Sequence, residues 1–188
     1  MTPRVPPPPF MRLEPRFERQ FRGFELEEEC IGHKIDWSEI LKQKRIPEEG
    51  LSRKQWERII QELYPLDPQS PKKKWSKDLF DFVADKLNLD IEEPEGLYFY
   101  NALGSGLDRK GADCFFVFKN PNTKKEAVFK IDITANPKKD EPDAPWRADL
   151  IINRTPDYRS NPEDYVQEMD KIAAKIAERL KEKTELIH

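Results

Sequence analysis

The sequence predicts an α+β protein, with a small antiparallel sheet that has helices before and after it. Three short runs rich in aromatic and β-branched residues, 97–103, 112–119 and 126–134, are separated by turn-rich segments and predict a three-stranded meander. Apolar residues recur at helical spacing before the first run and again over residues 162–185. Helices on both sides of a meander are typical of an α+β sandwich.

The helices of the first half are predicted from their N-terminal signals. Asp36 and Ser52 each precede a segment with apolar residues at helical spacing, and the segment at Asp36 resembles a capping box. The first helix should end near Lys44 and the second before Pro65. A third helix should start at residues 70–71. Its expected apolar face is Trp75, Leu79, Phe82, Val83 and Leu87.

The second half should end with a strand and a long helix. Residues 148–153 form a short fourth strand, and residues 162–185 form the last helix. The expected buried stripe of this helix is Val166, Met169, Ile172, Ala173, Ile176 and Leu180. Two interpretations of this helix remain open: it covers the sheet, or it forms the interface of a homodimer.

Three regions follow from these elements. Residues 1–16 are proline-rich and predict a disordered tail. Residues 17–66 form a helical extension, and residues 71–188 form the α/β core. The extension has only a slight basic excess, which leaves two roles open: a structural or partner-binding subdomain, or one that contacts nucleic acid.

Composition excludes several classes of protein. The net charge of −3 gives no global basic field, while 11% aromatic residues argue against wholesale disorder in 188 residues. Only two histidines and two distant cysteines, Cys30 and Cys114, argue against histidine catalysis, a zinc cluster and a disulfide framework. Neither a membrane span nor a signal peptide is evident, so we expect a cytoplasmic protein.

The predicted hairpin brings two carboxylates together. If Lys119 pairs with Glu126 across a six-residue loop, Asp113 lies directly opposite Asp132. Like charges in this position destabilise a sheet by roughly 0.2–1 kcal/mol. A cation held between the two carboxylates would remove the repulsion. Alternatively, the two aspartates are structural and form surface ion pairs with cations such as Arg109.

Strand alternation places further polar residues beside this pair. Lys130 and Thr134 share a face with Asp113 and Asp132. Two carboxylates suit Mg²⁺ or Mn²⁺, which binds oxygen ligands and completes its shell with water and phosphate oxygens. A lysine beside the metal can orient the attacking water or stabilise charge on the phosphate.

These residues also resemble a known family. The segments GLDRKGADCFFVF and VFKIDIT are similar to the core of the PD-(D/E)xK nuclease superfamily. The Gly-x-Asp at residues 111–113 matches its second strand, and Asp132 matches the acid of its third. The resemblance covers about residues 71–185. It implies a restriction-endonuclease-like core, with a helix, a meander and a further helix and strand, and metal-dependent hydrolysis of DNA.

The sequence departs from the family pattern in two places. The family lysine is replaced by Thr134, so Lys130 is the expected substitute and Lys138 a weaker one. The fourth strand is expected before the final helix, which disturbs the usual order. An acid on the family's first helix sometimes completes the site, and the candidates here are Asp78, Asp81 and Asp85. Asp108 is expected to form a turn rather than bind metal.

Three hypotheses follow. In the first, the protein is a metal-dependent DNA endonuclease that uses Asp113, Asp132 and Lys130. In the second, it is a catalytically inactive member of the same fold that serves in binding or assembly, which the loss of the motif lysine favours. In the third, it is an interaction protein with no relation to nucleases.

Overall fold

The structure is a computed structural model that describes residues 25–134, 148–153 and 158–185. The tail predicted at residues 1–16 and the candidate Lys138 lie outside the described residues. No helix in the described ranges is long and apolar enough to cross a membrane.

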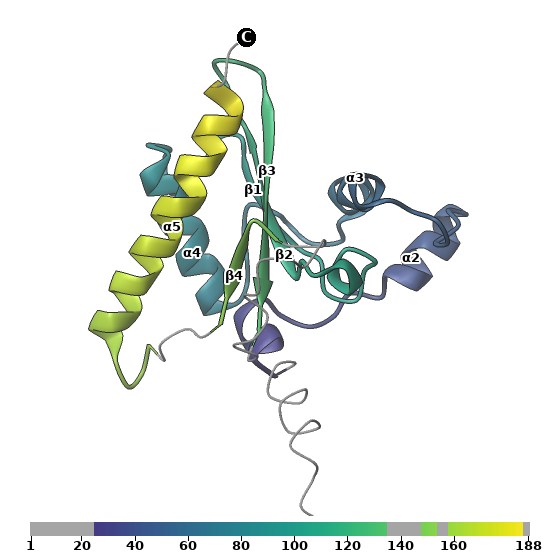
Figure 1. The fold of residues 1–188 in the computed structure, drawn as a ribbon, viewed down its shortest axis with the longest axis horizontal. Helices are drawn as coiled ribbons and strands as arrows, with labels where there is room; N and C mark the ends of the chain where they lie inside the picture. The colour runs from purple at the N-terminus through teal and green to yellow at the C-terminus, as the bar shows by residue number, and fades with distance from the viewer. Residues whose placement is uncertain (1–24, 135–147, 154–157, 186–188) are drawn as a thin grey trace, which may run out of the picture.

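A mixed four-stranded sheet forms the centre of the protein (Figure 1). Its strands are β1 (Leu97–Asn101), β2 (Cys114–Lys119), β3 (Glu126–Ile133) and β4 (Leu150–Ile152), side by side in this order. β1, β2 and β3 are antiparallel neighbours, and β4 runs parallel to β3. The predicted α+β class and meander are confirmed.

Two helices, α4 (Lys74–Lys86) and α5 (Pro162–Glu185), cover one face of this sheet (Figure 1). Strand alternation sends every second hairpin residue, including Phe116 and Phe129, into the core beneath these helices. The hydroxyl of Tyr165 donates a 2.8 Å hydrogen bond to Asp78 and ties α5 to α4.

The opposite face is covered by α2 (Trp37–Lys44) and α3 (Arg53–Leu63). The side chains of Trp56 and Ile60 are completely or almost completely buried there, in a second apolar cluster with the other face of the sheet. Asp36 and Ser52 cap these helices as predicted, and Ser52 forms a full capping box with Gln55. The helices of the extension are therefore one of three layers in the fold (Figure 1).

Several predicted boundaries differ from those observed. The third helix begins at Lys74, later than predicted, and its N-cap residue Lys73 makes no side-chain cap. β1 ends at Asn101 because that side chain accepts a 2.8 Å hydrogen bond from the Leu103 N–H and turns the chain. Val166 is predicted in the buried stripe of α5, but it is 50% exposed. As predicted, β4 precedes α5.

The three-layer arrangement predicts that α3 unfolds together with the sheet. An Ile60→Ala variant leaves a cavity at a completely buried position, so we expect a loss of about 2–5 kcal/mol in unfolding free energy. Urea unfolding followed by far-ultraviolet circular dichroism measures this loss. Val166→Ala on the exposed face of α5 is the control and should change stability by less than about 0.5 kcal/mol. A separate early transition in the Ile60 variant, with the main one unchanged, would contradict a shared fold.

Candidate functional site

The register of the central hairpin brings Asp113 and Asp132 together. Lys119 pairs with Glu126, as predicted, and Cys114 lies opposite Ile131. Asp113 directly precedes β2, and its N–H donates a 2.9 Å hydrogen bond to the Ile131 carbonyl, which brings its side chain within hydrogen-bond reach of Asp132. We call these two residues the aspartate pair.

Both members of the aspartate pair are buried, each with 3% of its surface exposed. Asp113 Oδ2 accepts a 2.6 Å hydrogen bond from the Ile133 N–H, which fixes one carboxylate oxygen against the backbone of β3. The two side chains also hydrogen-bond to each other. Two carboxylates at hydrogen-bond distance repel each other unless a proton or a cation lies between them.

The surroundings of Asp113 favour its protonated form. Burial is the main cause that raises its pKa, to about 9, and the negative charges of Asp132 and Glu27 raise it further. Glu27 lies in the helical segment 25–30. The sequence patterns missed this residue, because residues 17–35 give no clear periodicity and a third acid is expected only on the helix after residue 70. Its only signal is the acidic run Glu27 to Glu29.

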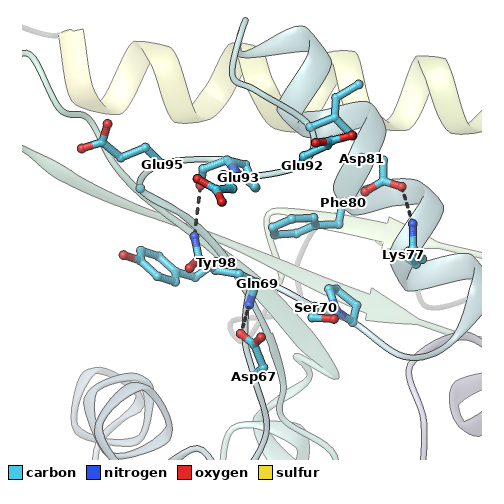
Figure 2. A pocket seen from close by; sticks show the side chains of 14 residues that line it. Asp67, Gln69, Ser70, Lys77, Phe80, Asp81, Glu92, Glu93, Glu95 and Tyr98 are labelled. Carbon is cyan, nitrogen blue, oxygen red and sulfur yellow. Dashed lines mark hydrogen bonds and ion pairs between the residues drawn. The ribbon is translucent and has the colours of Figure 1, made fainter.

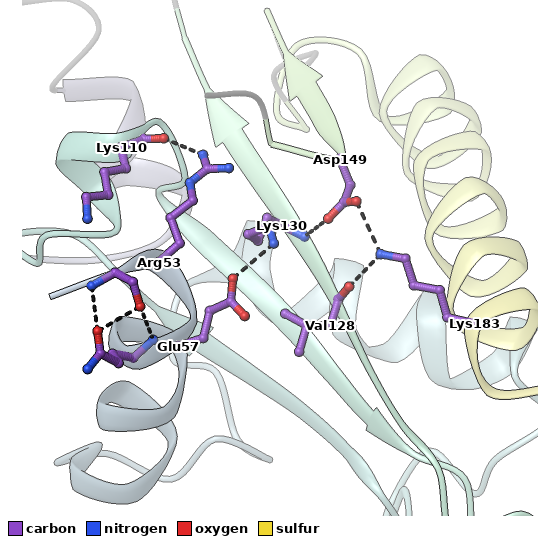
Figure 3. Close-up of polar contacts among 9 residues, drawn as sticks. Arg53, Glu57, Lys110, Val128, Lys130, Asp149 and Lys183 are labelled. Atoms are coloured by element: carbon purple, nitrogen blue, oxygen red, sulfur yellow. Dashed lines mark hydrogen bonds and ion pairs between the residues drawn. The ribbon is translucent and has the colours of Figure 1, made fainter. Parts of the chain in front are cut away.

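Lys130 shares a face of β3 with Asp132, but its ammonium forms an ion pair outside the aspartate pair. Its ammonium forms a 3.0 Å ion pair with Glu57 of α3, and both side chains are mostly buried, with 20% and 14% exposed (Figure 3). The backbone N–H of Lys130 donates to Asp149, which also accepts from Lys183 of α5. The structure therefore holds Lys130 between the sheet and α3.

The remaining candidates lie in different places. Thr134 is buried at the end of β3, and its N–H donates a 2.9 Å hydrogen bond to the Ile152 carbonyl. Asp108 accepts a 2.8 Å hydrogen bond from the Gly104 N–H and closes the loop before β2, in keeping with the expected turn. Asp78 and Asp81 of α4 form ion pairs with Lys74 and Lys77.

Asp81 belongs to a separate acidic cavity (Figure 2). This cavity of about 970 Å³ lies beside α4 and the start of β1. Its charged lining residues are Asp67, Asp81, Glu92, Glu93, Glu95 and Lys77. Five carboxylates against one ammonium repel phosphate, so the cavity does not suit a nucleic-acid backbone.

The aspartate pair suits a hard divalent cation. Its ligands would be carboxylate oxygens, which Mg²⁺ and Mn²⁺ prefer. Within the described ranges, no group of three or more His, Cys, Asp or Glu side chains is arranged to hold a metal ion. A site with two carboxylates therefore needs oxygens from water and substrate, which is the usual mode of Mg²⁺ binding near phosphates.

Comparison with known proteins adds no further assignment. No protein-family model, curated protein or solved structure matches the chain.

The raised pKa of Asp113 predicts that stability falls with increasing pH. Above the ordinary pKa of 3.8 the unfolded chain releases a proton that Asp113 of the folded protein retains. The stability that Asp113 contributes is therefore complete below that pH and is lost as pH rises towards about 9. An Asp113→Asn variant keeps the oxygen that accepts from Ile133 and removes the titration. We expect its unfolding free energy to lose the pH slope, which is at most about 1.4 kcal/mol per pH unit.

Urea unfolding of both proteins at several pH values from about 5 to about 8.5 measures this slope. Glu95→Gln, at an exposed carboxylate, is the matched control and should follow the wild type. Parallel curves for wild type and Asp113→Asn would contradict a protonated Asp113.

Proposed function

We propose that the protein is a metal-dependent DNA endonuclease, with Asp113 and Asp132 as ligands of Mg²⁺ or Mn²⁺. The single observation that supports this most is the buried, hydrogen-bonded aspartate pair. Burial of two adjacent carboxylates is unfavourable unless a proton or a cation neutralises them. The resemblance to PD-(D/E)xK nucleases adds the DNA substrate and the hydrolytic reaction to this proposal.

In the proposal, the protein places the ligands before the metal arrives. The Ile133 N–H orients Asp113, and the position of Asp132 within β3 holds its carboxylate opposite. When bound, the cation activates a water molecule and neutralises the charge that develops on the phosphate. The charge of Glu27 raises the pKa of Asp113, but Glu27 does not form a three-carboxylate group with the pair, so the remaining oxygens would come from water and substrate.

Lys130 is the proposed cationic group for the attacking water or the phosphate. It lies two residues before Asp132 on the same side of β3, but its ammonium is 3.0 Å from Glu57. An active role therefore requires the ion pair to open when substrate phosphate competes with Glu57 for the lysine. Thr134 occupies the position of the family lysine, but it carries no charge and does not supply the cationic group.

The second candidate function is a catalytically inactive module for binding or assembly. The specific observation in its favour is the Lys130–Glu57 ion pair, which gives the lysine a structural role between β3 and α3. In this alternative the aspartate pair retains its shared proton and binds no cation. The α2–α3 layer is then the proposed contact surface for a protein partner.

Titration of Mn²⁺ into the purified protein by calorimetry separates the two candidates. The endonuclease proposal predicts saturable binding that is lost in Asp132→Asn, and Mn²⁺-dependent cleavage of plasmid DNA that is lost in the same variant. Loss of a required metal ligand should reduce cleavage at least about a hundredfold, since the metal supplies several kcal/mol of transition-state stabilisation.

Asp81→Asn is the matched control, because Asp81 lies in the acidic cavity and pairs with Lys77. This variant should retain both binding and cleavage. Metal binding without cleavage, on several DNA substrates, would contradict the endonuclease activity but leave the metal site, whereas the inactive module predicts no Mn²⁺ binding. Absence of Mn²⁺ binding both with and without DNA would refute the metal site itself.

A further inference from the structure

A second cavity lies at the β1 edge of the sheet, and neither member of the aspartate pair lines it. It has a volume of about 450 Å³ and is lined by residues 31–35, 64–67 and 70–73 and by two residues of β1. Its lining is mainly apolar and includes Ile31, Ile35, Leu66, Pro71 and Phe99. Both the volume and the lining are typical of sites for small molecules. We call it the edge cavity.

The segment that closes the edge cavity is anchored to the backbone of β1. The N–H of Phe99 donates a 2.7 Å hydrogen bond to the Pro68 carbonyl, and the N–H of Asn101 donates a 3.0 Å bond to the hydroxyl of Tyr64. Both bonds satisfy groups that the edge of a sheet would otherwise leave unpaired. The cavity is therefore enclosed by ordered backbone.

Tyr64 supplies a hydrogen-bond donor to the edge cavity. Its hydroxyl oxygen accepts from Asn101, and no described residue accepts its own proton. Burial raises the pKa of Tyr64 to about 12, so the hydroxyl keeps this proton at neutral pH. A ligand oxygen in the cavity would satisfy the donor.

Lys73 supplies a positive charge. It lines the edge cavity and is half-buried, with its aliphatic stem against Gly32, where a Cβ would lie 3.8 Å from Lys73 Cγ. Among the described residues, no carboxylate lies within ion-pair distance of its ammonium. The only described carboxylate that lines the cavity is Asp67, which accepts a hydrogen bond from the Gln69 N–H. A lysine at the cavity wall that makes no ion pair with a described carboxylate favours an anionic ligand.

We propose that the edge cavity binds a small amphipathic carboxylate, with its apolar body against Phe99 and its carboxylate between Lys73 and Tyr64. A carboxylate is an acceptor for both the ammonium and the phenol. The apolar lining accounts for the body of the ligand, because removal of its surface from water drives binding. This site is independent of the aspartate pair and of the endonuclease proposal.

Calorimetric titration with octanoate tests the proposal. We expect saturable binding at millimolar concentrations or below, at least about tenfold weaker binding of 1-octanol, which lacks the charge, and no binding of acetate, which lacks the apolar body. Lys73→Met keeps the length of the side chain but removes its charge, and it should weaken octanoate binding at least about tenfold. Tyr64→Phe keeps the ring and should weaken it severalfold.

Lys77→Met is the matched control, since Lys77 lies in the acidic cavity and pairs with Asp81. It should bind octanoate like the wild type, and circular dichroism should show that every variant is folded. Equal affinity for octanoate and 1-octanol would overturn the proposal, as would unchanged affinity in Lys73→Met. Failure of the folded wild type to bind octanoate would also overturn it.

Discussion

The register between β2 and β3 is the constraint on which the rest of the structure depends. Both faces of this hairpin are buried, one beneath α4 and α5 and the other beneath α2 and α3. A slip of one residue would exchange the two sets of side chains between layers that differ in shape. Pairs such as Phe116 with Phe129 therefore fix the register of the sheet, and this register brings Asp113, next to the Cys114–Ile131 pair, beside Asp132.

The site is a consequence of this constraint. The packing that stabilises the hairpin also holds two carboxylates together in a buried position, where burial favours the protonated form of Asp113. In the proposed function, a divalent cation takes the place of that proton. We infer that the two apolar layers, by stabilising the hairpin, maintain the ligand arrangement before metal and substrate bind.

Much of this was predictable from local patterns. The hairpin register followed from one turn-rich loop between two apolar runs, and the caps at Asp36 and Ser52 followed from short-range hydrogen bonds. The Lys130–Glu57 contact was not predictable, because its partners are 73 residues apart and meet only through the packing of α3 on the sheet. Glu27 was missed for the same reason, since only tertiary structure brings its charge near Asp113.

In the proposed function, a cation and a proton compete for the aspartate pair. Calorimetry of Mn²⁺ binding at neutral pH, repeated in buffers with different ionisation enthalpies, counts the protons released for each ion bound. We predict release of about one proton by the wild type, because Asp113 must lose its proton to bind metal, and little release by Asp113→Asn. Tight Mn²⁺ binding by the wild type without proton release would contradict this competition.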